Sequence, residues 1–196
     1  MAGPLTESAL EQLFTEARTH YDWHPEPLPE TLLRQLYELL KFGPTSANGS
    51  PARFQFCASA QARERLAACV SAQNADKVRN APVTVIIGMD MAWHDRLPAL
   101  FPHTDARSWF ADNPVLIRDT AFRNSSLQGA WLIMAARALG LDTGPMSGFD
   151  PAAVDAAFWK GSTVETNFLC SIGHGTGQKQ FQRLPRLSFE DACRIV

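Results

Sequence analysis

The chain has 196 residues, a formal net charge of −2, about 45% hydrophobic residues and 19% charged residues. These values suit one compact domain over residues 1–196 and exclude a disordered chain, and the lack of a basic tract argues against nucleic-acid binding. No apolar run approaches the roughly 18 residues of a membrane helix, and the first residues lack a signal-peptide pattern, so we expect a cytoplasmic protein without membrane contact.

Apolar spacing predicts the elements of the first half of the chain. Residues 5–20 show the spacing of one helix face, and a second helix starts at Glu30 and stops at the Gly-Pro pair at 43–44. A short strand is expected near 54–58 and a helix over 61–74. Residues 83–89 form a continuous β-branched run, which is typical of a strand buried on both faces.

The second half starts with a region that is harder to interpret. Residues 90–116 mix aromatic residues and prolines, which favours short helices and loops. The clearest long helix is predicted over 119–139, and it is apolar around most of its circumference. A strand-to-turn segment follows at 141–149, and residues 167–173 read as a further strand.

Several common motifs are absent from the sequence. The four cysteines form no C-x-x-C pair, so neither a zinc cage nor a redox dithiol is predicted, and those at 57, 69 and 170 lie in apolar contexts typical of buried reduced thiols. The histidines lack ligand spacing, so no metal site is predicted. There is no P-loop, and GHGTG at 173–177 breaks the G-x-G-x-x-G spacing of a dinucleotide fingerprint.

Three polar clusters remain as candidate sites. GPTSANGSP at 43–51 places several hydrogen-bonding side chains in one turn, Asn74 and Lys77 share a helix face, and Arg18-Thr19 ends the first helix. Taken singly, each is explained at least as well by a helix stop, a solvated helix end or a basic residue at a helix C-terminus.

In combination, the clusters resemble the FMN-dependent nitroreductase family. The resemblance rests on ARTHY at 17–21, PTSAN at 44–48, N-x-x-K at 74–77, GLDTGPMSGF at 140–149 and RLP at 183–185. These motifs keep the family's order across essentially the whole chain. The stretches GPTSANGSPAR, RLPALFPHTDARSWF and AFRNSSLQ are similar to one branch in particular, the malonic semialdehyde reductases of bacterial pyrimidine degradation.

The resemblance implies a fold and an assembly. The family fold is α+β, with a central mixed β-sheet surrounded by helices. Two chains form an intertwined homodimer with FMN at the subunit interface, and the C-terminal arm, here residues 173–196, is exchanged between them. The helix at 119–139 would form much of the dimer core.

The resemblance also implies roles for individual residues. Arg18 and Arg183 would hold the FMN phosphate, because guanidinium groups bind phosphate oxygens bidentately. Asn74 and Lys77 match residues that contact the pyrimidine edge of the flavin. The cofactor-binding set implied is Arg18, Thr19, Tyr21, Pro44, Thr45, Ser46, Asn48, Asn74, Lys77, Pro145, Met146, Ser147, Gly148 and Arg183.

The sequence departs from the family pattern in three places. Tyr21 stands where many relatives carry Lys or Arg, so a direct charge contact with the flavin is in doubt. Ser147 stands where many carry Glu, which makes the site less negative and would suit an anionic substrate. Smaller residues at 50–52, where relatives often have Gln-Pro-Trp, would reshape the pocket.

The function implied is an NAD(P)H oxidoreductase that reduces malonic semialdehyde to 3-hydroxypropionate by ping-pong hydride transfer, with NADPH or NADH as donor. Arg53 and Arg107 are candidates to meet the substrate carboxylate, although an ion pair with Asp105 or another acid explains Arg107 slightly better. His20 and His103 are candidate proton donors. A broad nitroreductase or quinone reductase is one alternative, and a flavin-binding dimer with little turnover is another.

Overall fold

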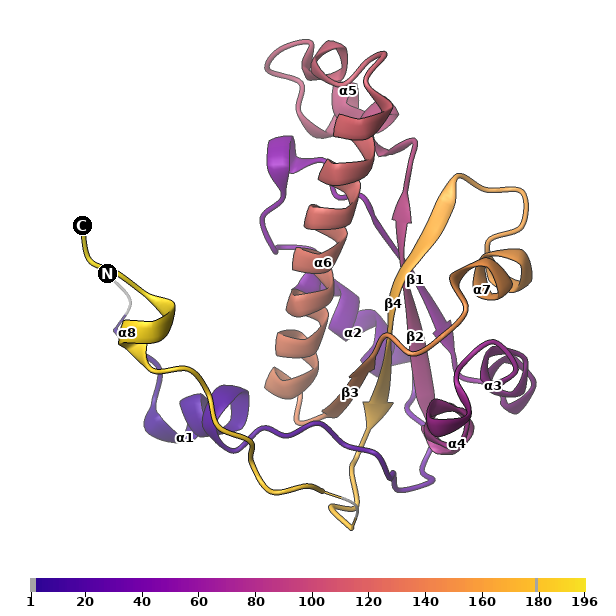
Figure 1. Ribbon diagram of the computed structural model, residues 1–196, viewed down its shortest axis with the longest axis vertical. Helices are drawn as coiled ribbons and strands as arrows, with labels where there is room; N and C mark the ends of the chain where they lie inside the picture. The colour runs from indigo at the N-terminus through magenta and orange to yellow at the C-terminus, as the bar shows by residue number, and fades with distance from the viewer. Residues whose placement is uncertain (1–2, 179) are drawn as a thin grey trace.

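A four-stranded sheet with helices on both faces forms the centre of the molecule, seen in a computed structural model (Figure 1). The structure describes residues 3–178 and 180–196, so the first two residues and Lys179 of the arm lie outside the described residues. In chain order the elements are α1 (Glu7–Leu10), a π-helical turn (Glu11–Thr15), α2 (Glu30–Leu40), β1 (Ala52–Cys57), α3 (Ala60–Ala67), α4 (Ala72–Asn80), β2 (Val83–Asp90), α5 (Leu97–Leu100), α6 (Pro114–Ala138), β3 (Asp142–Met146), α7 (Pro151–Phe158), β4 (Val164–Gly173) and α8 (Phe189–Ala192), with short 3₁₀ turns at Ser46–Asn48, Trp93–Arg96 and Ala106–Trp109.

Strand β2 lies inside the sheet and is buried on both faces, as its β-branched run predicts. Val83, Val85 and Ile87 belong to an apolar cluster with residues of α2 and α6. Ile86 belongs to a second cluster on the opposite face, with residues of α3, α4 and α7. Side chains alternate along a strand, so the run supplies both layers of the core.

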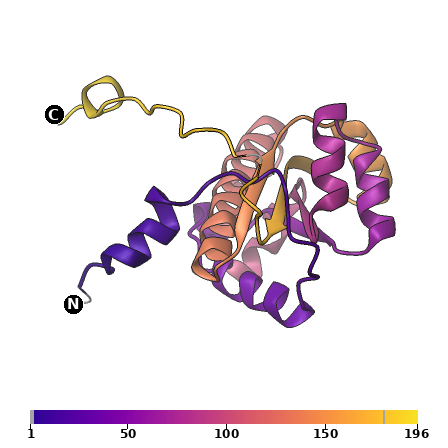
Figure 2. The same ribbon diagram turned by 90° about the horizontal axis from the view of Figure 1, so that it is seen from below.

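The helices therefore form two layers around the sheet. Helices α2 and α6 cover one face, and α3, α4 and α7 cover the other, which Figure 2 shows from below. A third apolar cluster, which includes Trp93, Phe110 and Ala121, packs the 90–116 region onto the first half of α6. The predicted α+β class, with a central sheet surrounded by helices, is confirmed.

The expectation of a mixed sheet is wrong for this chain. All three strand pairings, β1–β2, β2–β4 and β3–β4, are antiparallel. Within the described residues, parallel pairing is limited to an isolated bridge between Thr19 and Thr143, which is too short to count as a strand. The exchange of the arm between two chains stays a prediction.

Three predicted helices have different limits in the structure. The helix expected over residues 5–20 ends at Thr15, and Thr19 already pairs with β3, so Arg18-Thr19 lies beyond the helix. The helix expected over 61–74 is broken, because the residues between α3 and α4 turn outward to pair with the loop after β3: Val70 bridges Phe149, and the Ser71 N–H donates to the Gly148 carbonyl at 3.0 Å. Helix α6 begins earlier than predicted, at Pro114, where the Asn113 side chain accepts the Leu116 N–H at 3.0 Å. This is a standard N-cap with proline in the first turn.

The cysteines predicted to be buried from their apolar sequence contexts are buried in two of three cases. Cys57 and Cys170 are buried, and burial raises the pKa of Cys57 to about 11 and that of Cys170 to about 12. Cys69 is only half-buried, and Cys193 is exposed near the end of the arm. Figure 2 shows both ends of the chain, α1 and the arm with α8, extending from the same side of the body.

Candidate functional site

The segment 18–21 lies along strand β3. Thr19 bridges Thr143, and the His20 N–H donates to the Thr143 carbonyl at 3.1 Å. This pairing holds segment 18–21, which contains residues predicted to bind the FMN phosphate and the flavin ring, beside the start of β3. Figure 1 shows the segment passing below β3 and β4.

Tyr21, Lys77, Asn74 and Gly148 come together as one connected group. The Lys77 ammonium lies over the Tyr21 ring, 4.3 Å from its centre, and donates to Asn74 Oδ1 at 2.9 Å. Asn74 Nδ2 in turn donates to the Gly148 carbonyl at 3.0 Å. Burial lowers the pKa of Lys77. The predicted pyrimidine-edge residues therefore share a neighbourhood with the turn after β3.

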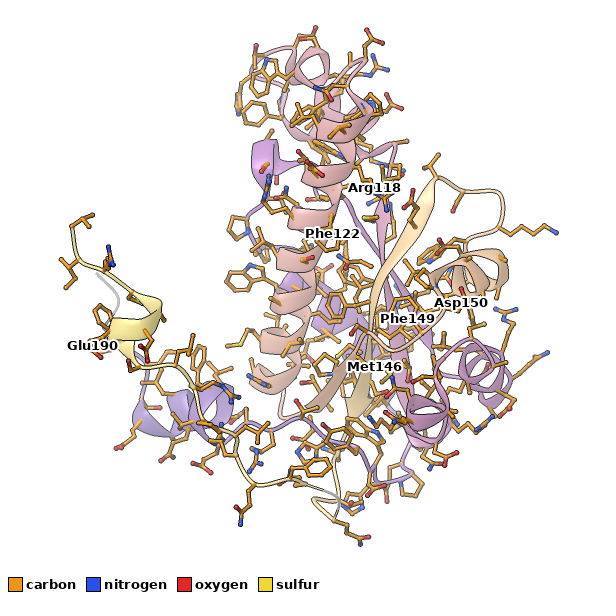
Figure 3. The ribbon with its side chains drawn as sticks, in the orientation of Figure 1. Arg118, Phe122, Met146, Phe149, Asp150 and Glu190 are labelled. Carbon is orange, nitrogen blue, oxygen red and sulfur yellow. The ribbon has the colours of Figure 1, made fainter. Side chains whose placement is uncertain are left out.

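That turn has little room for larger side chains. A Cβ at Gly148 would stand 2.7 Å from Asn74 Nδ2, so glycine permits the close approach of the turn to α4. Met146 ends β3 and Phe149 follows the turn, and Figure 3 labels both between β3 and α7. Pro145 and Ser147 are exposed.

Arg18 and Arg183 also lie together, although they are far apart in sequence. Both line one groove with Thr19 and Tyr21. The Arg18 guanidinium donates to the Phe181 carbonyl, and the Arg183 guanidinium donates to the carbonyls of Thr15 and Ala17. These bonds hold the start of the arm against the N-terminal segment.

The sequence predicts His20 as a proton donor, but its side chain is buried and already contacts polar groups of its own chain. Its side chain is within 3.2 Å of Asp142 Oδ1 and 2.9 Å of Gln180 Nε2, and the residue is 8% exposed. Asp142 also accepts the Gly175 N–H at 2.8 Å. Burial raises the pKa of Asp142, but the hydrogen bonds from His20 and Gly175 and the nearby histidine charges outweigh it and hold that pKa below its usual range. The geometry favours a structural role, in which His20 and Asp142 hold Gln180 and Gly175 at the start of the arm.

The loop at 43–51 forms a second group, organised by α6. Ala47, Asn48 and Ser50 have positive φ angles of 48°, 52° and 42°, so the loop turns sharply. Thr45 Oγ1 accepts the Ser50 N–H at 3.1 Å, and Asn48 Nδ2 donates to the Leu100 carbonyl at 2.9 Å.

Two buried side-chain amides of α6 accept hydrogen bonds from the backbone of this loop and of the residue after it. Asn124 Oδ1 accepts the Ser46 N–H at 2.8 Å, and Gln128 Oε1 accepts the Ala52 N–H at 2.8 Å. Pro44, the second residue of the loop, is exposed. Within the described part of the chain, no hydrogen bond or ring contact joins this second group to the group around Arg18 and Lys77.

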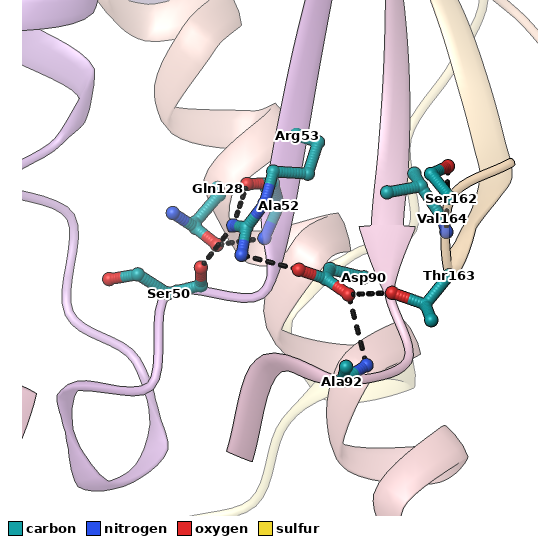
Figure 4. Close-up of polar contacts among 9 residues, drawn as sticks. All are labelled: Ser50, Ala52, Arg53, Asp90, Ala92, Gln128, Ser162, Thr163 and Val164. Atoms are coloured by element: carbon teal, nitrogen blue, oxygen red, sulfur yellow. Dashed lines mark hydrogen bonds and ion pairs between the residues drawn. The ribbon is translucent and has the colours of Figure 1, made fainter. Parts of the chain in front are cut away.

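The two arginines expected to meet a substrate carboxylate are already paired. Arg53 lies 2.6 Å from Asp90 and donates to the carbonyls of Ser50 and Ala52, as Figure 4 shows. Asp90 is further held by Thr163 and the Ala92 N–H. This network fixes the exit of the 43–51 loop and favours a positioning role for Arg53.

Arg107 and His103 lie in the 90–116 region. Arg107 pairs with Asp95 at 2.7 Å, so the acid is Asp95 and not the neighbouring Asp105. His103 is exposed and meets the Phe101 ring edge-on, and Phe101 meets Trp109 in the same way. Their contact with substrate stays a prediction.

Several residues of these groups were not singled out from the sequence. Asn124, Gln128 and Asp142 are polar residues on or beside apolar elements, and so is Arg137, which lines the same groove as Arg18 and Arg183. Their signal is the presence of a polar side chain on the buried face of a helix or at the start of a strand. A buried amide or carboxylate needs a partner, so such positions indicate a loop or segment to be held.

No three His, Cys, Asp or Glu side chains among residues 3–178 and 180–196 are grouped as metal ligands. No helix in the described chain is long and apolar enough to cross a membrane.

Comparisons with known proteins agree on one family. Residues 15–174 match the Nitroreductase family. A Burkholderia lata protein with the provisional name NADH dehydrogenase/NAD(P)H nitroreductase is 60% identical over 191 residues, covering 97% of this chain and 98% of that protein. A Polynucleobacter asymbioticus protein of the same provisional name is 54% identical over the full length of both.

Solved structures show the same fold. A provisionally named nitroreductase from Exiguobacterium sibiricum, solved in complex with FMN, superposes with a TM-score of 0.86 and 20% identity, and the match covers all of both chains. At this identity the likeness concerns the fold.

Proposed function

The chain belongs to the nitroreductase family, and from this premise we propose that it is an FMN-dependent NAD(P)H oxidoreductase that reduces malonic semialdehyde to 3-hydroxypropionate. The observation that carries the cofactor part is the convergence of the polar clusters at β3. Arg18, Tyr21, Asn74, Lys77 and Arg183 come from three separate parts of the sequence and line adjoining surfaces.

The residues present fit a flavin mononucleotide. The arginines suit its phosphate, and the Lys77–Asn74 pair offers donors for the pyrimidine edge, where negative charge develops on reduction. Gly148 has no side chain, which allows the turn after β3 to lie close to Asn74. When bound, FMN would supply hydride chemistry between NAD(P)H and the acceptor in a ping-pong cycle, while the chain's residues would hold and orient it.

The chain's own residues orient the reactants and set the charge of the site. Tyr21 and Asn74 hold the Lys77 ammonium from two sides, so the cation is fixed before the cofactor is reduced. Preorganised charge of this kind costs no reorganisation during the reaction. Burial lowers the pKa of Lys77, and the same partial loss of hydration would strengthen its interaction with an anionic pyrimidine edge.

For the semialdehyde, hydride reaches the carbonyl carbon and a proton reaches the oxygen, which gives the alcohol. Ser147 supports this substrate, because a serine in place of the glutamate of many relatives removes a negative charge that would repel the substrate carboxylate. The similarity of several stretches to the malonic semialdehyde reductases supports it as well. Because Arg53 and Arg107 are already paired, we propose that the absence of a carboxylate at position 147 carries the preference for an anionic substrate.

A two-chain assembly is part of the proposal. The loop at 43–51 and the group around Arg18 both match FMN-binding positions, yet they form separate groups within one chain. A second copy would bring the loop of one chain to the β3 group of the other. The apolar surface of α6 supports this, since Phe122, Leu127 and Trp131 are exposed by 55%, 46% and 43%.

Parallel rate measurements test the substrate. We expect kcat/KM for malonic semialdehyde to exceed that for a neutral nitroaromatic, and we expect Ser147→Glu to lower the first with a smaller effect on the second. The matched variant Ser147→Gln keeps the size without the charge and should retain most semialdehyde activity. A protein that prefers the nitroaromatic, or a quinone, belongs with the broad reductases. Bound FMN with negligible NAD(P)H oxidation would indicate a flavin-binding dimer.

A further inference from the structure

The groove beside Arg18 and Arg183 is lined by two further arginines. We call it the arginine groove; it measures about 500 Å³ and is lined by Arg18, Arg137, Arg183 and Arg186, among others. Of the described residues that line it, none carries a carboxylate. A smaller lobe of about 100 Å³ shares Ala17, Arg18 and Arg137 with the groove, and the carboxylate of Asp142 also lines this lobe.

Arg137 stands where the two hollows meet. It lies in the last turn of α6, and its Nη1 donates to the Leu13 carbonyl at 2.8 Å, while its own carbonyl accepts from Gln12 Nε2 at 2.6 Å. A guanidinium has five N–H donors. Only the bond to Leu13 engages the Arg137 guanidinium among the described residues, so most of its donors are free for a ligand in the groove.

The electrostatics of Arg137 favour an anion at this point. Burial lowers its pKa, Cys170 and Asp142 oppose this shift, and the positive charge of Arg183 adds to it. The Arg137 guanidinium is therefore half-buried between one carboxylate, Asp142, and a second guanidinium, Arg183. An anion between the guanidinium groups relieves the repulsion and replaces lost hydration.

We propose that Arg137 is a third phosphate-binding guanidinium that, together with Arg18 and Arg183, makes the site select phosphorylated flavin over riboflavin. The inference rests on the proposed flavin function. A phosphate monoester carries close to two negative charges at neutral pH and three terminal acceptor oxygens, so it can accept hydrogen bonds from a third guanidinium besides Arg18 and Arg183. Arg137 is half-buried and lies in the last turn of a long helix, so it is held more firmly than the exposed Arg183 of the arm.

The test compares two ligands that differ only by the phosphate. Apoprotein is titrated with FMN and with riboflavin, and binding is followed by quenching of flavin fluorescence. For Arg137→Gln we expect the Kd for FMN to rise about tenfold or more, with the Kd for riboflavin changed less than about twofold. Arg34→Gln is the matched control, because Arg34 is an exposed arginine on α2 whose ion pair among the described residues is with Glu30, and the change should alter neither Kd.

A second readout uses inorganic phosphate and needs no flavin. Phosphate should raise the Tm of wild-type apoprotein and of Arg34→Gln, and raise that of Arg137→Gln clearly less. Equal losses of FMN and riboflavin affinity in Arg137→Gln, or no loss of either, would overturn the role of Arg137. Wild-type protein that binds neither flavin, yet is stabilised by phosphate through Arg137, would overturn the flavin function and leave the anion site standing.

Discussion

A single carboxylate, Asp142, ties the start of β3 to the arm. It pairs with His20 and accepts the Gly175 N–H, and its pKa lies below the usual range because these bonds outweigh burial. A carboxylate with a lowered pKa in the folded state stabilises the protein at pH values above its unfolded pKa. That contribution is lost as pH falls through the lower folded pKa.

Asp142→Asn should therefore reduce the free energy of unfolding near pH 7 by about 1 kcal/mol, a figure lowered for the partial exposure of this side chain. Near pH 3 the difference between variant and wild type should shrink. Urea unfolding followed by circular dichroism measures both values. Asp76→Asn, which changes an 85% exposed side chain, is the control. If the difference in the free energy of unfolding between Asp142→Asn and wild type stays constant with pH, the charge of Asp142 does not contribute to holding the arm.

At the scale of one element, α6 is packed too closely at Gly129 to accept a side chain. A Cβ there would overlap the Phe168 ring of β4. Helix propensity alone predicts that Gly129→Ala stabilises the protein by about 1 kcal/mol. The overlap predicts the opposite sign, a loss of about 1–3 kcal/mol from overpacking.

The sign of the change in the free energy of unfolding decides between these effects. Chemical denaturation of Gly129→Ala measures it directly. Ala130→Gly alters the next, exposed residue and should cost about the ordinary propensity difference. Stabilisation by Gly129→Ala would show that the contact between α6 and β4 is looser than described.

Local pattern predicted most of these elements and missed those set by contacts far along the chain. The β-branched run of β2 and the Gly-Pro stop after α2 carry their own signals. The break between α3 and α4 does not, because it depends on pairing of Val70 and Ser71 with the loop after β3. The antiparallel order of the sheet is likewise a tertiary property.

The candidate site divides in the same way. Resemblance supplied the residues around Arg18 and Lys77, and the structure brings them together. It also shows what no local pattern contains, namely that Arg53 and Arg107 are occupied by Asp90 and Asp95. Arg137 was missed because a basic residue at the C-terminus of a helix is commonplace.

At the scale of the whole molecule, apolar surface indicates where a second chain belongs. Besides the outer face of α6, the arm exposes Leu184 by 71% and Leu187 by 74%. Figure 3 shows the arm, marked by Glu190, apart from the body of the chain, with Phe122 and Arg118 on α6. Exposed apolar surface on this scale is typical of an interface.

Light scattering after size exclusion should give twice the 21.6 kDa chain mass for the wild type. Leu127→Glu should shift the protein toward the single-chain mass, because it places a charge in the centre of the proposed interface. Tyr37→Glu changes an equally exposed residue of α2, 46% in both cases, and should leave the dimer intact. A wild type that elutes with the single-chain mass would contradict the proposed assembly.

The central claim is that the groups around β3 hold a flavin that takes a hydride from NAD(P)H, and an anaerobic absorption spectrum tests it most directly. The purified protein, supplied with FMN if needed, should absorb near ~450 nm, and the band should bleach on addition of NADH or NADPH and return with an acceptor. A colourless protein that takes up no FMN, or a bound flavin that neither nicotinamide reduces, would contradict the account.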